Sequence, residues 1–227
     1  LFPWIAHGHL EKMLSTIRAL RKEFPTTDLI AGNVATSQGT RDLIDAGVDA
    51  VNVGIGPGAA CTTRLVAGVG VPQITAIFDC TKEASKENIP VIADGGIRRS
   101  ADLAKALAAG ASSVMLGQLL TGTDESPGRT VIRNDKKYKA YYGMASSTAL
   151  EYYGEEGSKK VAEGVEALVP VRGSVHEVIH SLTGGLRSAM SYNNARTIVE
   201  LSKNAEFIKC TSAGLTESHP HDVDLKI

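Results

Sequence analysis

Apolar positions follow a helical period at the start of the chain and then form short continuous runs. Leu, Ile, Met and Phe recur at three- and four-residue spacing over His9–Phe24, and this stripe predicts an amphipathic helix. The apolar runs Asp28–Asn33 and Ile89–Asp94 have the length of buried strands. Further helices are predicted over Thr40–Ala46, Ile74–Ser85 and Ser100–Ala109.

An internal repeat predicts two more strands. The frame AGxxxVxxG occurs at Ala46–Gly54 and at Ala109–Gly117, and in both copies a helix ends at glycine before a short apolar strand. Strands that alternate with helices predict an α/β fold with a parallel sheet, and their continuous apolar character predicts that both sheet faces are covered. The polar or glycine-rich segments after the strands then share one edge of the sheet, where parallel α/β folds build their sites.

The pattern changes after Gly117. Residues Thr121–Lys137 are polar and turn-rich, and Glu151–Gly164 has little periodicity, which predicts a mobile surface loop or flap. We interpret Gly184–Arg187 as a turn at a helix end and residues 217–227 as an extended polar tail. Two helices are predicted near Ser174–Leu182 and Asn194–Ser202.

Composition narrows the class of protein. The 227 residues fit one α/β domain, and 43% of them are hydrophobic, as in ordinary globular proteins. The formal net charge of −1 gives no field that attracts nucleic acid or an anionic membrane, and no apolar run is long enough to span a bilayer. Three scattered cysteines, Cys61, Cys80 and Cys210, favour a reducing, cytoplasmic location over a disulfide framework or a structural zinc site.

The stretch ADGGIR follows a predicted strand and is a candidate ligand site. Asp94 can accept two hydrogen bonds from ribose hydroxyls, and Gly95 and Gly96 let backbone N–H groups approach a phosphate. The alternative is a tight turn with a capping carboxylate. Because Gly117 ends the next strand at the same edge, the two segments together favour a nucleoside monophosphate or a similar phosphate ligand.

The stretch GIGPGAACTTR presents Cys61 in a loop whose glycines allow unusual dihedral angles. Such a loop can bring the thiol to a ligand held at the neighbouring strand end, with Thr63 donating or relaying a proton. A lone cysteine is more often buried filler, and no histidine lies nearby in sequence to activate it. The carbonyls of Gly56, Gly58 and Cys61 could also converge on a monovalent cation.

Several motifs in order resemble the IMP dehydrogenase/GMP reductase family. They are GIGPGAACTTR…GVGVPQ (54–73), ADGGIRRSADLAKALAAGASSVMLG (93–117), YYGMAS (141–146), EGVE (163–166), GGLRSAMSY (184–192) and AGLTESHPHDV (213–223). The family fold is a (β/α)₈ TIM barrel, and residues 1–227 match its C-terminal half: strands five to eight, a flap over about 151–164 and a tail over about 213–227. Leu1–Ala6 resembles the end of the fourth strand, so we expect a truncated chain.

The resemblance implies a covalent mechanism on a purine mononucleotide. Cys61 would attack C2 of the purine while a nicotinamide cofactor exchanges hydride at that carbon, with Thr63 and Glu163 completing the catalytic set. Asn33 is expected to contact the cofactor, although LFPW departs from the family near Trp4, where an aspartate contacts nicotinamide. The implied substrate-binding residues are Asp94, Gly95, Gly96, Gly117, Tyr141, Gly143, Met144 and Ala145.

The resemblance also implies a potassium site and a homotetramer of the full-length protein. In the dehydrogenase branch, a tail with Glu217, Ser218 and His219 completes a potassium site on a neighbouring subunit. Gly56, Gly58 and Cys61 would supply the carbonyls of that site. Ala59 and Gln118 replace serines that are usual at the phosphate site of dehydrogenases.

Two family reactions remain open, and the flap favours one of them. A dehydrogenase oxidises IMP to XMP with NAD and needs a flap Arg-Tyr pair that activates water, but this chain has no arginine between Arg133 and Arg172. A reductase converts GMP to IMP and ammonia with NADPH and needs no such arginine. We therefore favour GMP reductase, with IMP dehydrogenase or a non-catalytic nucleotide-binding fragment as alternatives. The GVGVPQ and ESHPHDV motifs look more like dehydrogenases.

Overall fold

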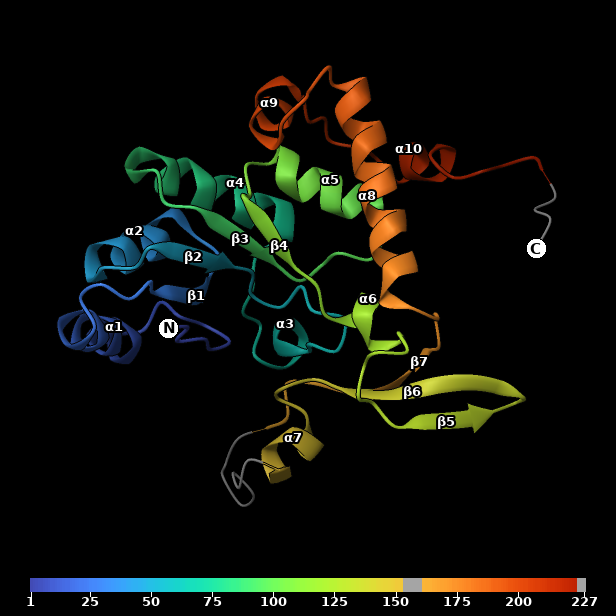
Figure 1. Ribbon diagram of the computed structural model, residues 1–227, viewed down its shortest axis with the longest axis horizontal. Helices are drawn as coiled ribbons and strands as arrows, with labels where there is room; N and C mark the ends of the chain where they lie inside the picture. Colours follow the sequence, from blue (N-terminus) through green and yellow to red (C-terminus); the bar gives the residue numbers. More distant parts are fainter. Residues whose placement is uncertain (153–160, 224–227) are drawn as a thin grey trace.

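The computed structural model describes residues 1–152 and 161–223 of the 227-residue chain. A parallel sheet with the strand order β1-β2-β3-β4 forms the N-terminal part of the fold (Figure 1). Its strands are β1 (Ile30–Val34), β2 (Ala50–Val53), β3 (Val91–Asp94) and β4 (Ser113–Met115). Each strand lies where the sequence predicts one, and the parallel pairing confirms the α/β class.

Helices cover one face of this sheet. Ile17, Leu43 and Ile77 are fully buried from three different helices, and they pack in one cluster with Val51 of the central strand β2. Successive residues of a strand point to opposite faces, so every second strand residue meets these helices. The four covering helices are α1 (Glu11–Glu23), α2 (Ser37–Ala46), α4 (Gln73–Ala84) and α5 (Ser100–Ala108).

The opposite face of the sheet is covered only in part. Ile30 and Ile92 are half-buried there and Ser113 is exposed, so the prediction of two equally covered faces holds for one face. Residues 1–6 run beside β1. Trp4 forms a parallel bridge with Gly32, and the N–H of Ile30 donates to the Leu1 carbonyl at 2.9 Å. The first residues therefore pair like the end of a further strand, as the sequence predicts.

A second apolar cluster lies between α5 and the C-terminal helices. Leu103 and Leu107 of α5 are buried with Leu182 and Leu201. Within residues 1–152 and 161–223, no helix combines the length and apolar character that a bilayer crossing demands. The remaining helices are α3 (Thr63–Val66), η1 (Ser85–Glu87), α6 (Gln118–Thr121), α7 (Ser147–Tyr152), α8 (Val175–Tyr192), α9 (Ile198–Asn204) and α10 (Ser212–Glu217).

An antiparallel sheet replaces much of the turn-rich segment predicted over Thr121–Lys137. Its strands are β5 (Thr130–Arg133), β6 (Lys136–Tyr142) and β7 (Glu166–Pro170), in the order β5-β6-β7. Asn134 and Asp135 both have positive φ and form the tight hairpin turn, which is a geometry that these residue types tolerate. The sequence pattern does not reveal β6 because a lysine, Lys139, stands at a buried position, which hides the alternation of apolar and polar residues.

The turn predicted at Gly184–Arg187 is wrong. Helix α8 runs unbroken through both glycines, and α5 packs directly against it. A Cβ at Gly185 would overlap the side chain of Ser100, whereas a Cβ at Gly184 would meet nothing within 4 Å. Gly185 therefore allows two helices to approach closely and does not mark a helix end.

This difference predicts opposite effects of two neighbouring substitutions. Gly184→Ala should raise the free energy of unfolding by roughly 0.5–1 kcal/mol, because alanine has the better helix propensity and the added methyl group has space. Gly185→Ala should lower it by about 1–3 kcal/mol, because the methyl group forces α5 and α8 apart. Urea denaturation followed by circular dichroism measures both. Equal effects of the two variants would contradict this packing.

Candidate active site

The loops that follow β2 and β3 pack against each other at the carboxyl edge of the sheet. Gly54 has a φ of +148°, and a Cβ there would overlap the Asp94 carbonyl oxygen. Gly95 has a φ of +83°, and its Cβ would lie 3.1 Å from the Pro57 ring. Gln73 ties the two strand ends together, because its amide donates to the carbonyls of Val53 and Asp94 at 3.0 and 3.1 Å. The Cys61 loop and the Asp94 loop are thus in direct backbone contact, as the sequence leads us to expect.

Two buried carboxamides hold the carboxylate of Asp94. Asn33 Nδ2 and Asn52 Nδ2 both donate to its Oδ2, at 2.9 and 2.8 Å. Asn52 Nδ2 also donates to Asn33 Oδ1 at 2.7 Å, so the three side chains form one network. No donor in the described part of the chain bonds to Oδ1 of the half-buried Asp94. That oxygen is available to a ligand hydroxyl.

Asn33 and Asn52 both belong to the network around Asp94. Asn33, for which the sequence predicts a cofactor contact, donates its two amide hydrogens to Gly54 O and to Asp94, and the cofactor contact stays a prediction. Asn52 was not singled out, although a polar residue inside the apolar run AVNVG is the signal that could have found it. It is fully buried, and its Oδ1 has no hydrogen-bond partner among the described residues.

The thiol of Cys61 is half-buried and lies next to Thr63. The Cys61 Sγ donates to Thr63 Oγ1 at 3.3 Å, which brings together the two residues that the sequence pairs. Thr63 is the first residue of the short helix α3 and is itself buried. In the described part of the chain, no lysine, arginine or histidine side chain hydrogen-bonds to the thiol.

Backbone pairing joins the Cys61 loop to the segments on both sides of the predicted flap. Cys61 forms an antiparallel bridge with Gly164, and the N–H of Thr62 donates to the Glu163 carbonyl at 2.8 Å. The N–H of Glu163 in turn donates to the Ala145 carbonyl at 2.9 Å. Three segments, 60–62, 143–145 and 163–165, therefore form one rigid unit. The central part of the predicted flap, residues 153–160, lies outside the described residues.

Tyr141 and Lys139 lie on one face of β6. Burial raises the pKa of the Tyr141 hydroxyl, and the charge of Cys61 raises it further. Lys139 is only 6% exposed, and its Nζ donates to the carbonyls of Asp124 and Ser126. The sequence interpretation missed Lys139, because a lysine within KKYK looks like a solvated surface charge.

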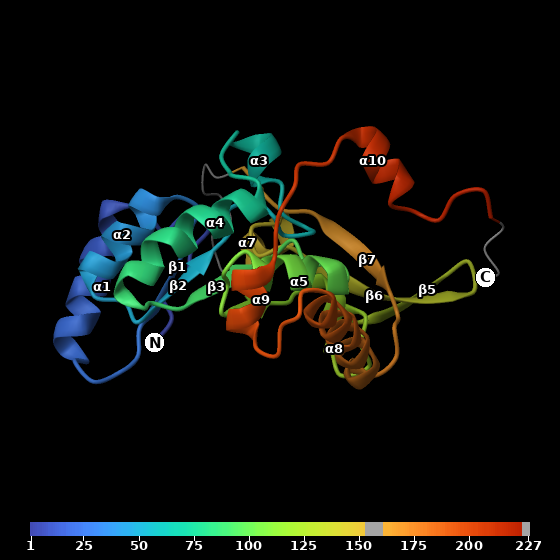
Figure 2. The ribbon, with the colours of Figure 1, turned by 90° about the horizontal axis from the view of Figure 1, so that it is seen from above.

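The remaining predicted residues are distributed as follows. A Cβ at Gly117 would meet nothing within 4 Å, so the strand end there borders open space. Met144 is 56% exposed beside the Cys61 loop. Figures 1 and 2 show α10 well away from α3, so Glu217, Ser218 and His219 do not meet the Cys61 loop within one chain. Ser218 and His219 instead bond to carbonyls of α10.

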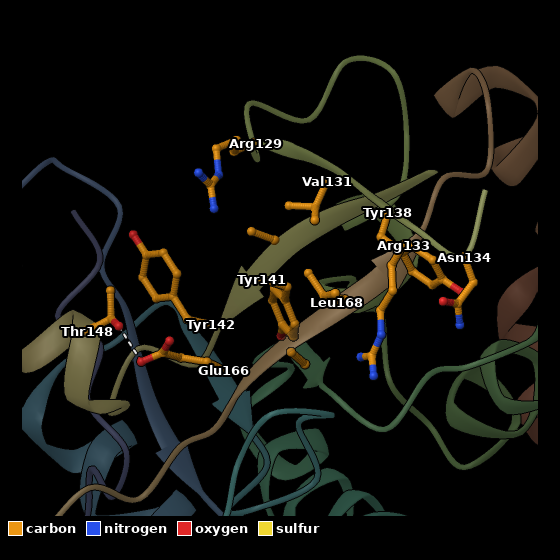
Figure 3. A pocket seen from close by; sticks show the side chains of 12 residues that line it. Arg129, Val131, Arg133, Asn134, Tyr138, Tyr141, Tyr142, Thr148, Glu166 and Leu168 are labelled. Atoms are coloured by element: carbon orange, nitrogen blue, oxygen red, sulfur yellow. Dashed lines mark hydrogen bonds between the residues drawn. The ribbon is translucent and has the colours of Figure 1, made fainter. Parts of the chain in front are cut away.

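A cavity of about 890 Å³ lies away from the thiol. It lies over the antiparallel sheet, where Tyr141 borders it but neither Cys61 nor Asp94 does (Figure 3). The cavity and the loops that carry the thiol and the carboxylate are therefore separate features of the surface.

Ligand sites of parallel α/β folds lie at the carboxyl ends of the strands, and the loops of Cys61 and Asp94 lie at this edge. Comparison with known proteins identifies the family. The chain belongs to the IMP dehydrogenase/GMP reductase family, because the model of the IMP dehydrogenase / GMP reductase domain matches residues 4–221.

Curated relatives are named inosine-5′-monophosphate dehydrogenase. The one from Halalkalibacterium halodurans is 52% identical over 226 residues, which are 97% of this chain and 47% of that protein. One from Helicobacter pylori is 55% identical over 228 residues, again 97% of this chain and 47% of that protein. The chain therefore spans about half the length of the curated relatives that it matches.

A solved structure from the other branch of the family is also similar. It is a cysteine-to-alanine variant of GMP reductase from Trypanosoma brucei in complex with guanosine 5′-monophosphate. It superposes with a TM-score of 0.92 at 43% sequence identity, and the match covers 98% of this chain and 48% of that one. The family is thus established, and both of its branches are represented among the relatives.

The three cysteines should differ in reactivity. Burial raises the pKa of the Cys80 thiol to about 11, so at pH 8 only about one molecule in a thousand carries its thiolate. Iodoacetamide at pH 8 should therefore modify the half-buried Cys61 and the exposed Cys210 of the native protein but spare Cys80. Peptide mass spectrometry measures the modification, and denatured protein, in which all three react, is the control. Rapid modification of native Cys80 would contradict the buried placement.

Proposed function

We propose that the chain is the C-terminal half of a (β/α)₈ barrel that acts on C2 of a purine mononucleotide. The four parallel strands in sequential order, the strand-like pairing of residues 1–6 and the half-length match to the relatives support the barrel. The partly covered face of β1–β4 is then the inner face, which the other half fills. The single observation that carries the chemistry is the Cys61–Thr63 pair, which lies on a loop that packs directly against the loop of Asp94.

The ligand contacts follow from this geometry. Asp94 Oδ1 accepts a ribose hydroxyl, since Oδ2 is already held by two amides. Backbone N–H groups near Gly95, Gly96 and Gly117, together with the hydroxyl of Tyr141, bind the phosphate. Gly143, Met144 and Ala145 lie beside the base, because segment 143–145 pairs with segment 163–165, which holds the Cys61 loop.

Of the two family reactions, we propose reductive deamination of GMP to IMP and ammonia. The Cys61 thiolate adds to C2, the amino group leaves as ammonia after protonation by Glu163 and Thr63, and the C2–S bond breaks when C2 is reduced. The nicotinamide cofactor, NADPH in this reaction, supplies the hydride. The absence of any arginine between Arg133 and Arg172 supports this choice, because no flap arginine is present to activate water. The similarity to a GMP-bound GMP reductase supports it as well.

Oxidation of IMP to XMP with NAD is the second candidate. The observation that favours it is the 51–55% identity to proteins named inosine-5′-monophosphate dehydrogenase. A potassium site belongs with this candidate. Glu217, Ser218 and His219 are remote from the Cys61 loop of their own chain, so they could reach Gly56 and Gly58 only in a neighbouring copy, as in a homotetramer.

A paired assay distinguishes the reactions. On a longer form of the protein that includes the rest of the barrel, GMP should oxidise NADPH, and IMP with NAD should give no NADH with or without potassium. Absorbance at the reduced-nicotinamide band follows both reactions. Potassium-stimulated formation of NADH from IMP would contradict the GMP reductase proposal and support oxidation of IMP to XMP. If neither cofactor turns over but GMP still raises the Tm, the non-catalytic alternative holds.

Substitution of the nucleophile gives a further prediction. Cys61→Ala should abolish turnover while GMP affinity stays within about tenfold, because the ribose and phosphate contacts remain. Calorimetric titration with GMP measures affinity, and the NADPH assay measures turnover. Cys210→Ala is the matched control, since Cys210 is exposed and remote from Asp94, and it should leave both unchanged. Residual turnover by Cys61→Ala would rule out the covalent route.

A further inference from the structure

The cavity over the antiparallel sheet is built by one face of its three strands. Tyr138, Ala140 and Tyr142 alternate along β6, and the register places Val131 and Leu168 on either side of them. Val131, Ala140 and Leu168 form an apolar floor, and Figure 3 shows the side chains of Val131 and Leu168 between the two ends of the cavity. The tyrosines and the apolar floor offer a flat ligand a surface on which an aromatic ring can stack.

The two ends of the cavity differ in charge. At one end, Tyr142 lies between Arg129 and Glu166 (Figure 3), and Glu166 Oε1 accepts a hydrogen bond from Thr148. At the other end, Arg133 and Asn134 stand beside the ring of Tyr138. This second end is lined by no acidic residue, and neither arginine has a hydrogen-bond or ion-pair partner among the described residues.

The spacing of the arginines restricts the shape of a ligand. Arg129 and Arg133 are four residues apart in extended chain, so their Cα atoms are separated by about 13 Å. Figure 3 shows their guanidinium groups at opposite ends of the cavity, so in this arrangement they do not clamp a single phosphate. An occupant must instead extend along β5, with an anionic group at Arg133 and a different group at the mixed end formed by Arg129 and Glu166.

We propose that this cavity is a second binding site for a nucleoside phosphate, separate from the site at Cys61. The phosphate binds the Arg133 guanidinium, whose planar donors match phosphate oxygens. The base stacks on Tyr142. Its edge donates an N–H group to the carboxylate of Glu166 and accepts a hydrogen bond from Arg129. A base with adjacent N–H and carbonyl groups, such as guanine, satisfies both residues, whereas adenine lacks the carbonyl.

This site can communicate with the candidate active site through continuous backbone. Strand β6 leads from Tyr142 directly into segment 143–145, and β7 begins at Glu166, directly after segment 163–165. Both segments are hydrogen-bonded to the Cys61 loop or to each other. A ligand that contacts Tyr142 and Glu166 therefore touches the residues that adjoin the rigid unit around Cys61.

Calorimetric titration of the protein with GDP, ADP and inorganic pyrophosphate tests the proposal. GDP should show a binding component that Arg133→Glu weakens by about tenfold or more, since a charge-assisted contact becomes repulsive. ADP and pyrophosphate should bind this site less tightly than GDP. Arg18→Glu is the matched control, because Arg18 is an exposed arginine on α1, and it should leave the GDP component unchanged. Glu166→Gln should weaken GDP but not pyrophosphate.

The outcomes separate this site from the proposed function. Protection of Cys61 from iodoacetamide by GMP reports the active site alone, and Arg133→Glu should not alter it. If GMP does not protect Cys61 in the unsubstituted protein, the proposed function is refuted, whereas the proposal of the second site is unaffected. The proposal of a nucleoside phosphate site is wrong if Arg133→Glu leaves the binding of GDP unchanged. It is also wrong if pyrophosphate binds as tightly as GDP, because the cavity then binds anions without recognising a nucleoside.

Discussion

The candidate active site depends on the close backbone packing of the loops that follow β2 and β3. Gly54 lies against the Asp94 carbonyl with no room for a side chain, and Gln73 joins the ends of both strands. The positions of the thiol and the carboxylate are therefore set by the sheet rather than by flexible side chains. Because folding already fixes the positions of Cys61 and Asp94, little conformational entropy of the protein is lost when a ligand contacts both residues.

The electrostatics of the edge follow from the same packing. The Asp94 carboxylate is held by the amides of Asn33 and Asn52, and no cationic side chain of the described residues pairs with it. Neutral donors orient the carboxylate without satisfying all of its oxygens. One oxygen remains to accept a hydroxyl, which is the arrangement that a ribose needs. A lysine or arginine in place of Asn52 would occupy that carboxylate as an ion pair.

The sequence predicts the parallel sheet well because each of its elements carries its own signal. Helical stripes, apolar strand runs and the AGxxxVxxG repeat all agree with the observed order. The antiparallel sheet carries no such signal, since β6 has a lysine, Lys139, on its buried side and β7 is distant from β6 in the chain. The turn predicted at Gly184–Arg187 is wrong because the sequence alone does not distinguish a glycine that permits close helix packing, such as Gly185, from a glycine that ends a helix. Motifs locate Cys61, Thr63 and Asp94, but Asn52 and Lys139 are recognisable only from burial and partners.

The two faces of the antiparallel sheet border different parts of the molecule. One face of β6 carries Lys139 and Tyr141 inward, and the ammonium group of Lys139 donates to two carbonyls of the loop after α6. The other face carries Tyr138 and Tyr142 outward into the cavity. Because alternate residues of a strand are fixed relative to each other, a shift of β6 that serves one face must move the other. The cavity and Tyr141 thus share one strand, and the pairing of segments 143–145 and 163–165 joins that strand to the loop that presents Cys61.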